Sequence, residues 1–205
     1  MIILGIPSGQ RADRLGDVLA AWRKLPVKIA LLTWDDETEK RYADKVDFFF
    51  RTPERRSFAC NHNQMMAALE GWQGYICGAD DLYPGTVDID RVAVICKLWN
   101  GHLLWVHDGL NQVQMTHPIV TPGYLQGGKL FDERFEHNYC DTDLMVTAAG
   151  KIVKMAAGQF DHRWHKAGMD AIYEIGGKTF ATDRQRFIEK HGNAHIQYED
   201  IVEVA

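Results

Sequence analysis

The first 80 residues alternate between short apolar runs and segments with helical spacing, and this order limits the possible folds more than any other feature. Expected strands cover residues 2–6, 27–33, 46–50 and 75–79, and expected helices cover residues 15–22, 38–44 and 65–72. Parallel neighbours in a sheet need crossover connections of this kind. The sequence therefore predicts an α/β fold, with a Rossmann-type, mostly parallel twisted sheet flanked by helices. Ligands in such sheets bind outside the carboxyl ends of the strands, so functional residues are expected there.

Beyond Pro84 the pattern is looser, but no linker divides the chain. The expected elements are a helix over 90–99, strands over 103–106 and 151–156, a glycine- and proline-rich stretch over 109–128, a histidine-containing loop over 160–167 and a C-terminal helix over 183–191. We therefore expect a single domain.

Composition places this domain among ordinary globular proteins. Of the 205 residues, 46% are apolar and 25% are charged, which excludes disordered, collagen-like and coiled-coil chains. The 23 basic and 28 acidic side chains give a formal net charge of -5. This balance provides no basic surface of the kind that binds duplex nucleic acid or an anionic membrane, so an anionic ligand must be bound locally.

The four cysteines lie far apart without a CxxC pair, and at least two fall in segments expected to be buried strand or helix. They are Cys60, Cys77, Cys96 and Cys140, and we expect free thiols. Residues 1–7 are too short for the core of a signal peptide, and residues 109–128 are too polar to cross a membrane. We expect a cytoplasmic protein without a membrane span.

Acidic pairs stand at or near the ends of three apolar runs: Asp35-Asp36, Asp80-Asp81, and Asp141 with Asp143. Carboxylates gathered at one sheet edge repel one another unless a cation or a proton is present. Each pair alone can equally cap a helix or a turn, which is a common use of aspartate. Three pairs in one α/β chain favour a metal ion instead. Because Mg²⁺ or Mn²⁺ held by one or two carboxylates completes its shell with water and phosphates, the pattern indicates a nucleotide diphosphate ligand.

Five short motifs also occur in an order that carries a family resemblance. They are Ile6-Pro7-Ser8-Gly9-Gln10-Arg11, Trp34-Asp35-Asp36, Asn61-His62-Asn63, Gly78-Ala79-Asp80-Asp81-Leu82 and Asp141-Thr142-Asp143-Leu144. Together they resemble the family-2 type nucleotide-sugar glycosyltransferases of the GT-A fold, over roughly residues 1–165. The resemblance implies a GT-A-like single domain that moves a sugar from a nucleotide diphosphate, expected to be a UDP-sugar, to an acceptor hydroxyl with inversion. Residues 1–100 would bind the donor, and residues 101–205 would bind the acceptor and supply the base.

The resemblance further implies a set of residues that contact or support the nucleotide. These are Pro7, Ser8, Arg11, Asp35, Asp36, Asn61, Asn63 and Asp80. Within this set, Asp35 or Asp36 would accept a hydrogen bond from the base, and Asp80 would contact the ribose or the sugar.

For the metal and the chemistry, the resemblance implies three side chains. Asp81 would bind Mn²⁺ or Mg²⁺ directly, and His162 would be a further ligand. Asp141 is similar to the family's general base, while Asp143 would hold the start of the following helix. The acidic motif departs from the family's Asp-x-Asp pattern, because residue 82 is leucine.

Several basic and aromatic residues near these motifs have two interpretations. The run over residues 160–166 can be a solvated turn or, through His162, His165, Arg163 and Lys166, a metal or diphosphate contact. The loop containing Arg51, Arg55 and Arg56 can likewise be solvated or bind diphosphate. Trp34 and Trp164 lie beside proposed site residues, where a ring can stack on a base or sugar.

Two other functions remain open from the sequence. A nucleotidyltransferase uses a similar metal-binding α/β domain, although residues 5–11 are a poor match to its phosphate loop. A non-catalytic nucleotide-sugar-binding module would keep the fold without transfer. The expected acceptor is a small molecule, a glycan or a hydroxylated DNA base. The region 110–134, with Tyr124 and Gln126, is expected to shape its site.

Overall fold

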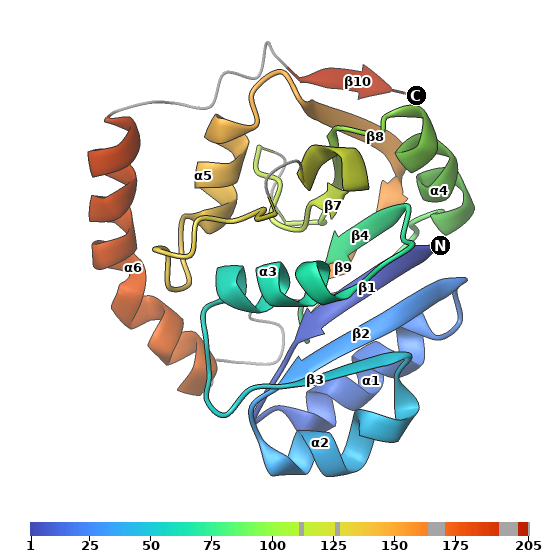
Figure 1. The fold of residues 1–205 in the computed structure, drawn as a ribbon, viewed down its shortest axis with the longest axis vertical. Coiled ribbons are helices and arrows are strands. Elements are labelled where there is room, and N and C mark those ends of the chain that lie inside the picture. The colour runs from blue at the N-terminus through green and yellow to red at the C-terminus, as the bar shows by residue number, and fades with distance from the viewer. Residues whose placement is uncertain (111–112, 126–127, 164–170, 193–200, 205) are drawn as a thin grey trace.

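The computed structural model describes residues 1–110, 113–125, 128–163, 171–192 and 201–204 (Figure 1). In these residues one sheet has the strand order β10-β8-β6-β7-β4-β1-β2-β3. Its strands are β1 (Ile2–Pro7), β2 (Val27–Thr33), β3 (Phe48–Arg51), β4 (Gly74–Cys77), β6 (Leu103–His107), β7 (Ile119–Val120), β8 (Ile152–Gln159) and β10 (Val202–Val204). A separate antiparallel pair consists of β5 (Leu82–Tyr83) and β9 (Asp161–His162).

Helices connect the strands and cover both faces of the sheet. They are α1 (Ala12–Trp22), α2 (Asp36–Tyr42), α3 (Phe58–Ala68), α4 (Ile89–Leu98), α5 (Cys140–Thr147) and α6 (Ala171–His191), with short 3₁₀ turns η1 (Ala43–Lys45) and η2 (Pro122–Leu125). Figure 1 shows α3 crossing the face of the sheet toward the viewer and α6 standing at one side of the molecule. Among the described residues, no helix is both long and apolar enough to span a membrane.

The sheet is mixed but mostly parallel. The strands β1, β2, β3 and β4 pair in parallel, as do β6, β8 and β10, while β7 is antiparallel to both β4 and β6. The predicted α/β class and parallel N-terminal half are confirmed. The antiparallel β7 was not expected, because its two residues are hidden in a glycine- and proline-rich stretch with no periodic signal.

Two apolar cores lie on opposite faces of the sheet because successive strand residues point to opposite sides. On β1, Leu4 and Ile6 belong to the core that includes Leu15 and Trp22 of α1. Ile3 belongs to the other core, which includes Met65 of α3 and residues of α5 and α6. The strands are therefore packed on both faces, and the loops after them start from buried positions.

Two expected helices differ from the structure at their ends. The helix predicted over residues 65–72 instead begins at Phe58, where Ser57 accepts a hydrogen bond from the Cys60 backbone N–H, and it ends at Ala68. The predicted C-terminal helix over residues 183–191 begins much earlier, at Ala171. There the polar sequence around Gly176 and Gly177 concealed the helical pattern. The four cysteines are free thiols, as expected.

Candidate functional site

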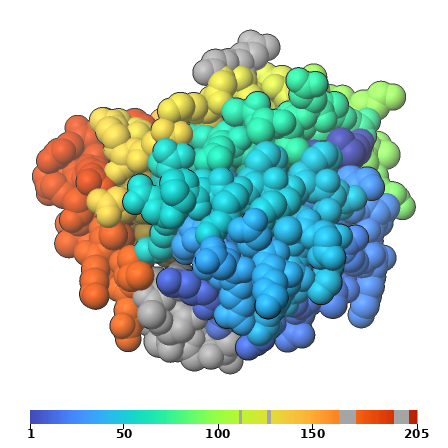
Figure 2. Space-filling view, turned by 60° about the horizontal axis from the view of Figure 1, so that its bottom comes forward, coloured from blue at the N-terminus to red at the C-terminus, as the bar shows by residue number. Residues whose placement is uncertain are grey.

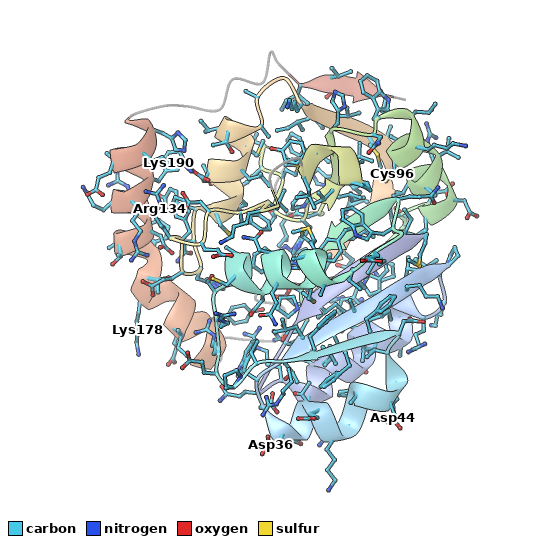
Figure 3. All side chains as sticks on the ribbon, viewed as in Figure 1. Asp36, Asp44, Cys96, Arg134, Lys178 and Lys190 are labelled. Carbon is cyan, nitrogen blue, oxygen red and sulfur yellow. The ribbon has the colours of Figure 1, made fainter. Side chains whose placement is uncertain are left out.

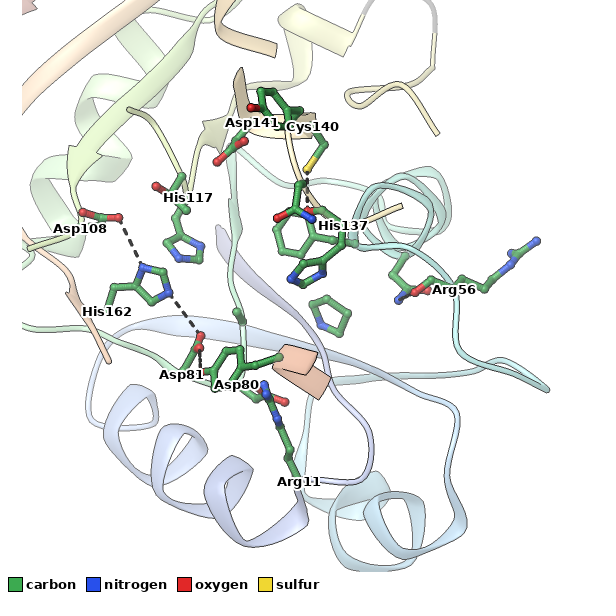
Figure 4. A pocket seen from close by; sticks show the side chains of 18 of the residues that line it. Arg11, Arg56, Asp80, Asp81, Asp108, His117, His137, Cys140, Asp141 and His162 are labelled. Carbon is green, nitrogen blue, oxygen red and sulfur yellow. Dashed lines mark hydrogen bonds and ion pairs between the residues drawn. The ribbon is translucent and has the colours of Figure 1, made fainter. Parts of the chain in front are cut away.

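A cavity of about 640 Å³ opens at the carboxyl ends of β1, β4 and β6 (Figure 4). Its wall includes the loop after β1, the loop after β4, the segment before β7, the start of α5 and part of α6. This is the sheet edge at which α/β proteins bind ligands. The volume lies in the usual range for small-molecule sites.

Asp80, in the loop after β4, is held from the first strand-to-helix loop. Ser8 donates its hydroxyl to Oδ2 of Asp80 at 2.7 Å, and Arg11 donates Nη1 to Oδ1 at 3.0 Å. Burial raises the pKa of Asp80, and although the Arg11 guanidinium opposes this shift, the net pKa lies above its ordinary value. The sequence assigned all three residues to the nucleotide, and the structure brings them together, with Asp80 and Arg11 in the cavity wall and Ser8 behind them.

Asp81 begins a chain of polar contacts along the cavity floor (Figure 4). Its Oδ1 lies 3.6 Å from Nε2 of His162, whose Nδ1 lies 3.4 Å from Oδ2 of Asp108. Its Oδ2 accepts a hydrogen bond of 2.6 Å from the Tyr173 hydroxyl on α6. Burial favours the neutral form of Asp81, but the nearby His162 and Tyr173 outweigh it, so the pKa of this carboxyl lies well below its ordinary value.

His162 is positioned by the two-stranded sheet, because its strand β9 pairs with β5. Strand β5 begins directly after the loop that carries Asp80 and Asp81, here called the acidic loop. Burial alone would lower the pKa of His162, but Asp108 and Asp81 raise it to about 9. An imidazolium at His162 therefore balances two carboxylates. In the described part of the chain, no group of three or more His, Cys, Asp or Glu side chains is arranged to hold a metal ion. Asp81 and His162 nonetheless fit such an ion chemically, because a carboxylate and an imidazole that has released its Nε2 proton both suit Mn²⁺ and leave positions for phosphate and water.

Asp141 faces the same cavity from the first turn of α5. One oxygen accepts the Thr142 backbone N–H at 2.8 Å, while burial raises the pKa of the carboxyl above its ordinary value. Just before the helix, Tyr139 has a left-handed backbone with φ 62°, which turns the chain toward the cavity. Asp143, two residues on, points away and binds Lys190 and His191 of α6.

The loop that leads into α5 is fixed from α6 by one buried carboxylate. Asp183 accepts the backbone N–H groups of Glu136, His137 and Asn138 at 2.9–3.0 Å. Figure 2 shows α6, in orange to red, lying beside the yellow segment that precedes α5. This contact helps to place Asp141, although no pattern in the sequence indicated it.

Two arginines line the cavity without a carboxylate partner in the described structure. They are Arg55 and Arg56, from the loop before α3; Arg56 donates to Gln64 instead. Burial lowers the pKa of Arg55, and the charge of Arg11 lowers it further. The guanidinium groups of Arg55 and Arg11 repel each other at the cavity wall, so they favour an anion between them. Arg51, in contrast, pairs with Asp36 and Glu39 outside the cavity.

Three buried polar atoms in the cavity wall have no hydrogen-bond partner among the described residues. They are Nε1 of Trp34, Oδ1 of Asn61 and Nε2 of His117. Buried polar groups in proteins are almost always paired, so unpaired ones that line one cavity indicate a polar ligand.

Besides Ser8, three residues assigned to the nucleotide lie outside the cavity wall. Asp35 caps α2 by accepting the Thr38 N–H, and it also accepts the Gln10 N–H. Asp36 pairs with Arg51 on the exposed surface of α2, where Figure 3 labels it. Asn63 is buried against the backbone of residues 130 and 131. Their predicted nucleotide contacts would therefore have to act through the surrounding loops.

The structure also supplies residues that the sequence did not single out. His62, rather than its asparagine neighbours, reaches the acidic loop, with Nε2 3.1 Å from the Gly78 carbonyl and Nδ1 2.9 Å from the Tyr75 hydroxyl. Burial lowers the pKa of His62 to about 3, so it is neutral. Asp108, at the end of β6, follows the same strand-end rule as Asp81 and was within reach of sequence reasoning. Tyr173 had no comparable signal.

Of the aromatic and polar residues expected near the ligand, the structure places some in the cavity wall and others outside it. Tyr124 packs half-buried against a core and does not line the cavity. Trp34 does line it, with its ring against Gly9, where an added Cβ would lie 2.3 Å from Cε2. Gln126 and the basic and aromatic residues after Arg163, namely Trp164, His165 and Lys166, lie outside the described residues.

Known structures share this fold over most of the chain. The mannosyltransferase PcManGT from Pyrobaculum calidifontis, in complex with GDP-Man and Mn²⁺, matches with a TM-score of 0.64 and 11% identity, over 95% of this chain and 65% of its own. S. aureus TarS 1-349 matches with a TM-score of 0.59 and 10% identity, over 78% of this chain and 59% of its own. A longer TarS structure matches with a TM-score of 0.64 and 10% identity, over 97% of this chain and 46% of its own.

No protein-family model and no curated protein matches the sequence. The chain spans between 46% and 65% of the length of the proteins with solved structures that it resembles. At 10–11% identity the likeness shows the fold alone. The expected GT-A-like, single-domain α/β fold is thereby confirmed.

Proposed function

We propose that the chain is a glycosyltransferase that moves a sugar from a nucleotide diphosphate, with a UDP-sugar as the first candidate, to an acceptor hydroxyl. The observation that carries this proposal is the shared cavity: the Asp80-Asp81 loop and Asp141 face the same space of about 640 Å³ at the sheet edge. The two carboxyl groups differ in acidity, because the pKa of Asp81 is lowered while that of Asp141 is raised. PcManGT, which shares the fold, was solved with GDP-Man and Mn²⁺.

The diphosphate would lie between the acidic loop and the arginines. Arg11 and Arg55 present positive charge on the cavity wall, and Arg55 has no carboxylate partner in the described chain. Asp81 and His162 would hold Mn²⁺ or Mg²⁺, which when bound would neutralise charge on the leaving diphosphate. Arg11 would remain bound to Asp80 and orient that carboxylate toward the ribose or the sugar.

The nucleobase would occupy the end of the cavity lined by Pro7, Trp34 and Asn61. The Trp34 ring lies against Gly9, and its unpartnered Nε1–H can donate to a base. The unpartnered Oδ1 of Asn61 can accept from one. Asp35 lies outside this wall, where it caps α2 and accepts the Gln10 backbone N–H.

Asp141 would act as the general base of an inverting transfer. Its raised pKa brings the carboxylate closer to the working pH, which favours proton removal from the acceptor hydroxyl. The acceptor would enter past Leu110 and Phe180, two half-exposed apolar side chains on the cavity rim. An acceptor of small-molecule, glycan or hydroxylated-base type with an apolar face suits this rim. Free thiols at all four cysteines support a cytoplasmic location for the enzyme.

Calorimetric titration with UDP, GDP, CDP and TDP, each with and without Mn²⁺, tests the proposal. We expect one diphosphate to bind in a Mn²⁺-dependent manner, and we expect Asp81→Ala to lose this dependence. Asp36→Ala is the matched control, because the side chain of Asp36 is 97% exposed and lies on α2. If no diphosphate binds in either condition, the proposal fails, and Asp80 and Asp81 have only a structural role. Donor hydrolysis that requires Asp141 would exclude a binding module without activity.

A further inference from the structure

His117 reaches the cavity floor because of the antiparallel strand β7. This strand pairs with β4 in the register Ile76↔Ile119, so the residues before β7 run along the carboxyl end of β4. The Cys77 backbone N–H donates to the Pro118 carbonyl at 3.0 Å. Nδ1 of His117 lies 2.9 Å from the Cys77 carbonyl oxygen. The histidine is therefore anchored to the strand that carries the acidic loop.

This anchor fixes the tautomer of the ring. A carbonyl oxygen can only accept, so Nδ1 of His117 carries the proton and Nε2 carries a lone pair. The side chain is 3% exposed, and Nε2 has no hydrogen-bond partner among the described residues. A buried acceptor without a partner is rare in folded proteins, and this one lines the cavity. It points to a donor supplied from the cavity.

The position of the ring narrows what that ligand group can be. The His117 ring lies edge-on to the ring of His162, with 4.5 Å between centroids. In Figure 4 the His117 ring lies between the labelled His162 and Asp141 side chains. The segment is also tied to α5, because Gln114 donates to the Thr142 hydroxyl at 3.0 Å. His117 thus stands between the group that would hold the diphosphate and the group that would act as base.

We propose that Nε2 of His117 accepts a hydrogen bond from a hydroxyl of the transferred sugar, which makes His117 a specificity-determining residue. The inference rests on the proposed function. In a sugar transfer, the reacting carbon must lie between the leaving diphosphate and the base, and the sugar fills that space. A diphosphate offers no hydrogen-bond donor to a lone pair at neutral pH, whereas a sugar hydroxyl does.

Two variants separate the two nitrogens of the ring. His117→Asn keeps an amide N–H near the position of Nδ1, so it can still donate to Cys77, but it removes the acceptor in the cavity. His117→Gln places an amide near the position of Nε2, so it restores a polar atom there. The comparison uses UDP and UDP-glucose, or GDP and GDP-mannose if the wild-type chain prefers guanine, each titrated with Mn²⁺ present.

We expect His117→Asn to weaken binding of the nucleotide sugar by about tenfold while leaving binding of the matching diphosphate unchanged. Unchanged diphosphate binding also shows that the variant is folded. His117→Gln should recover part of the loss. Among UDP-glucose analogues that each lack one hydroxyl, one should bind the wild-type chain about tenfold more weakly yet bind His117→Asn no worse than UDP-glucose does.

Other outcomes overturn the inference in distinguishable ways. If His117→Asn binds the nucleotide sugar as tightly as the wild-type chain, the hydroxyl contact does not exist. If the variant instead loses Mn²⁺-dependent diphosphate binding, His117 acts on the metal and not on the sugar. If the wild-type chain binds no diphosphate at all, the proposed function fails and this inference fails with it.

Discussion

The chain has two Asp-Asp pairs after buried strands, and the fold uses them in opposite ways. Asp80 and Asp81 are each 5% exposed and face the cavity. After β2, Asp35 instead caps a helix and the side chain of Asp36 is 97% exposed. The difference comes from the element into which each strand leads. The chain enters α2 directly after β2, so backbone N–H groups take up the first carboxylate.

After β4 the chain continues into the short strand β5, and no helix begins at the acidic loop. The carboxylates are therefore left to side-chain partners, namely Arg11 and Ser8 for Asp80 and Tyr173 for Asp81. The carboxylates of an Asp-Asp pair after a strand are thus available to a ligand only where no helix begins and no backbone N–H groups bind them. Asp141 and Asp143, two residues apart on α5, differ for another reason: Lys190 and His191 of α6 bind Asp143, whereas Asp141 faces the cavity.

The largest effect should come from Asp141→Asn. If Asp141 is the base, transfer should fall by about 10³-fold, because an amide cannot take a proton from the acceptor hydroxyl. Diphosphate binding should be unchanged, since the acidic loop and the arginines are intact. Transfer or donor hydrolysis, measured beside a calorimetric titration, checks both statements.

Asp143→Asn is the matched control on the same helix. Asp143 is 3% exposed and binds Lys190 and His191, so its loss should destabilise the fold by about 3 kcal/mol. The folded fraction should retain its activity. Equal loss of transfer in both variants, at a temperature where both are folded, would contradict the assignment of Asp141 as base.

Much of the fold was readable from the sequence, because the periodic signal was strong where the elements are long. The strands β1 and β2 and the helix α1 lie where their apolar spacing placed them. The short strands β7 and β9 have two residues each, too few to show a period, yet they position His117 and His162. Sequence reasoning therefore located strand-end aspartates but missed partners that arrive through tertiary contacts, such as Tyr173.

The next effect concerns Asp183, which accepts three backbone N–H groups and is fully buried. Although burial opposes them, these bonds hold the pKa of Asp183 below its ordinary value. Asp183→Asn should cost about 2–3 kcal/mol of unfolding free energy at pH 7. A lowered pKa stabilises the fold above the unfolded value near pH 4, and this contribution is lost as the pH falls through the folded pKa.

Urea denaturation at pH 7 and at pH 3 checks this prediction. The difference between the wild-type chain and Asp183→Asn should be large at pH 7 and should shrink at pH 3. A difference that did not change with pH would show that the carboxylate charge is not what holds residues 136–138.

Two adjacent glycines of α6 should respond in opposite directions to the same substitution. A Cβ on Gly176 would lie 2.4 Å from Cδ2 of His137, whereas nothing lies within 4 Å of a Cβ on Gly177. Gly176→Ala should therefore destabilise the fold by about 1–3 kcal/mol, because the His137 ring in the cavity wall must move. Gly177→Ala should stabilise it by up to about 1 kcal/mol, because alanine favours the exposed helix interior. Thermal unfolding of both variants decides this, and a Gly176→Ala variant as stable as the wild-type chain would show that α6 does not pack against His137.

The smallest effect returns to the first aspartate pair. Asp35→Ala removes the cap of α2 and the contact with the Gln10 N–H, so it should cost about 1 kcal/mol. Asp36→Ala should cost less than about 0.5 kcal/mol, because its exposed ion pair with Arg51 contributes little. Against the effect of burial, hydrogen bonds hold the pKa of Asp35 below its ordinary value, so the cost of Asp35→Ala should fade below about pH 4. Both variants should keep the diphosphate preference of the wild-type chain, since neither carboxylate reaches the cavity. If Asp35→Ala kept the stability of the wild-type chain but lost that preference, the Asp35 carboxylate would bind the nucleobase and would not serve as the helix cap. The helix that follows β2 would then not explain why the two Asp-Asp pairs differ.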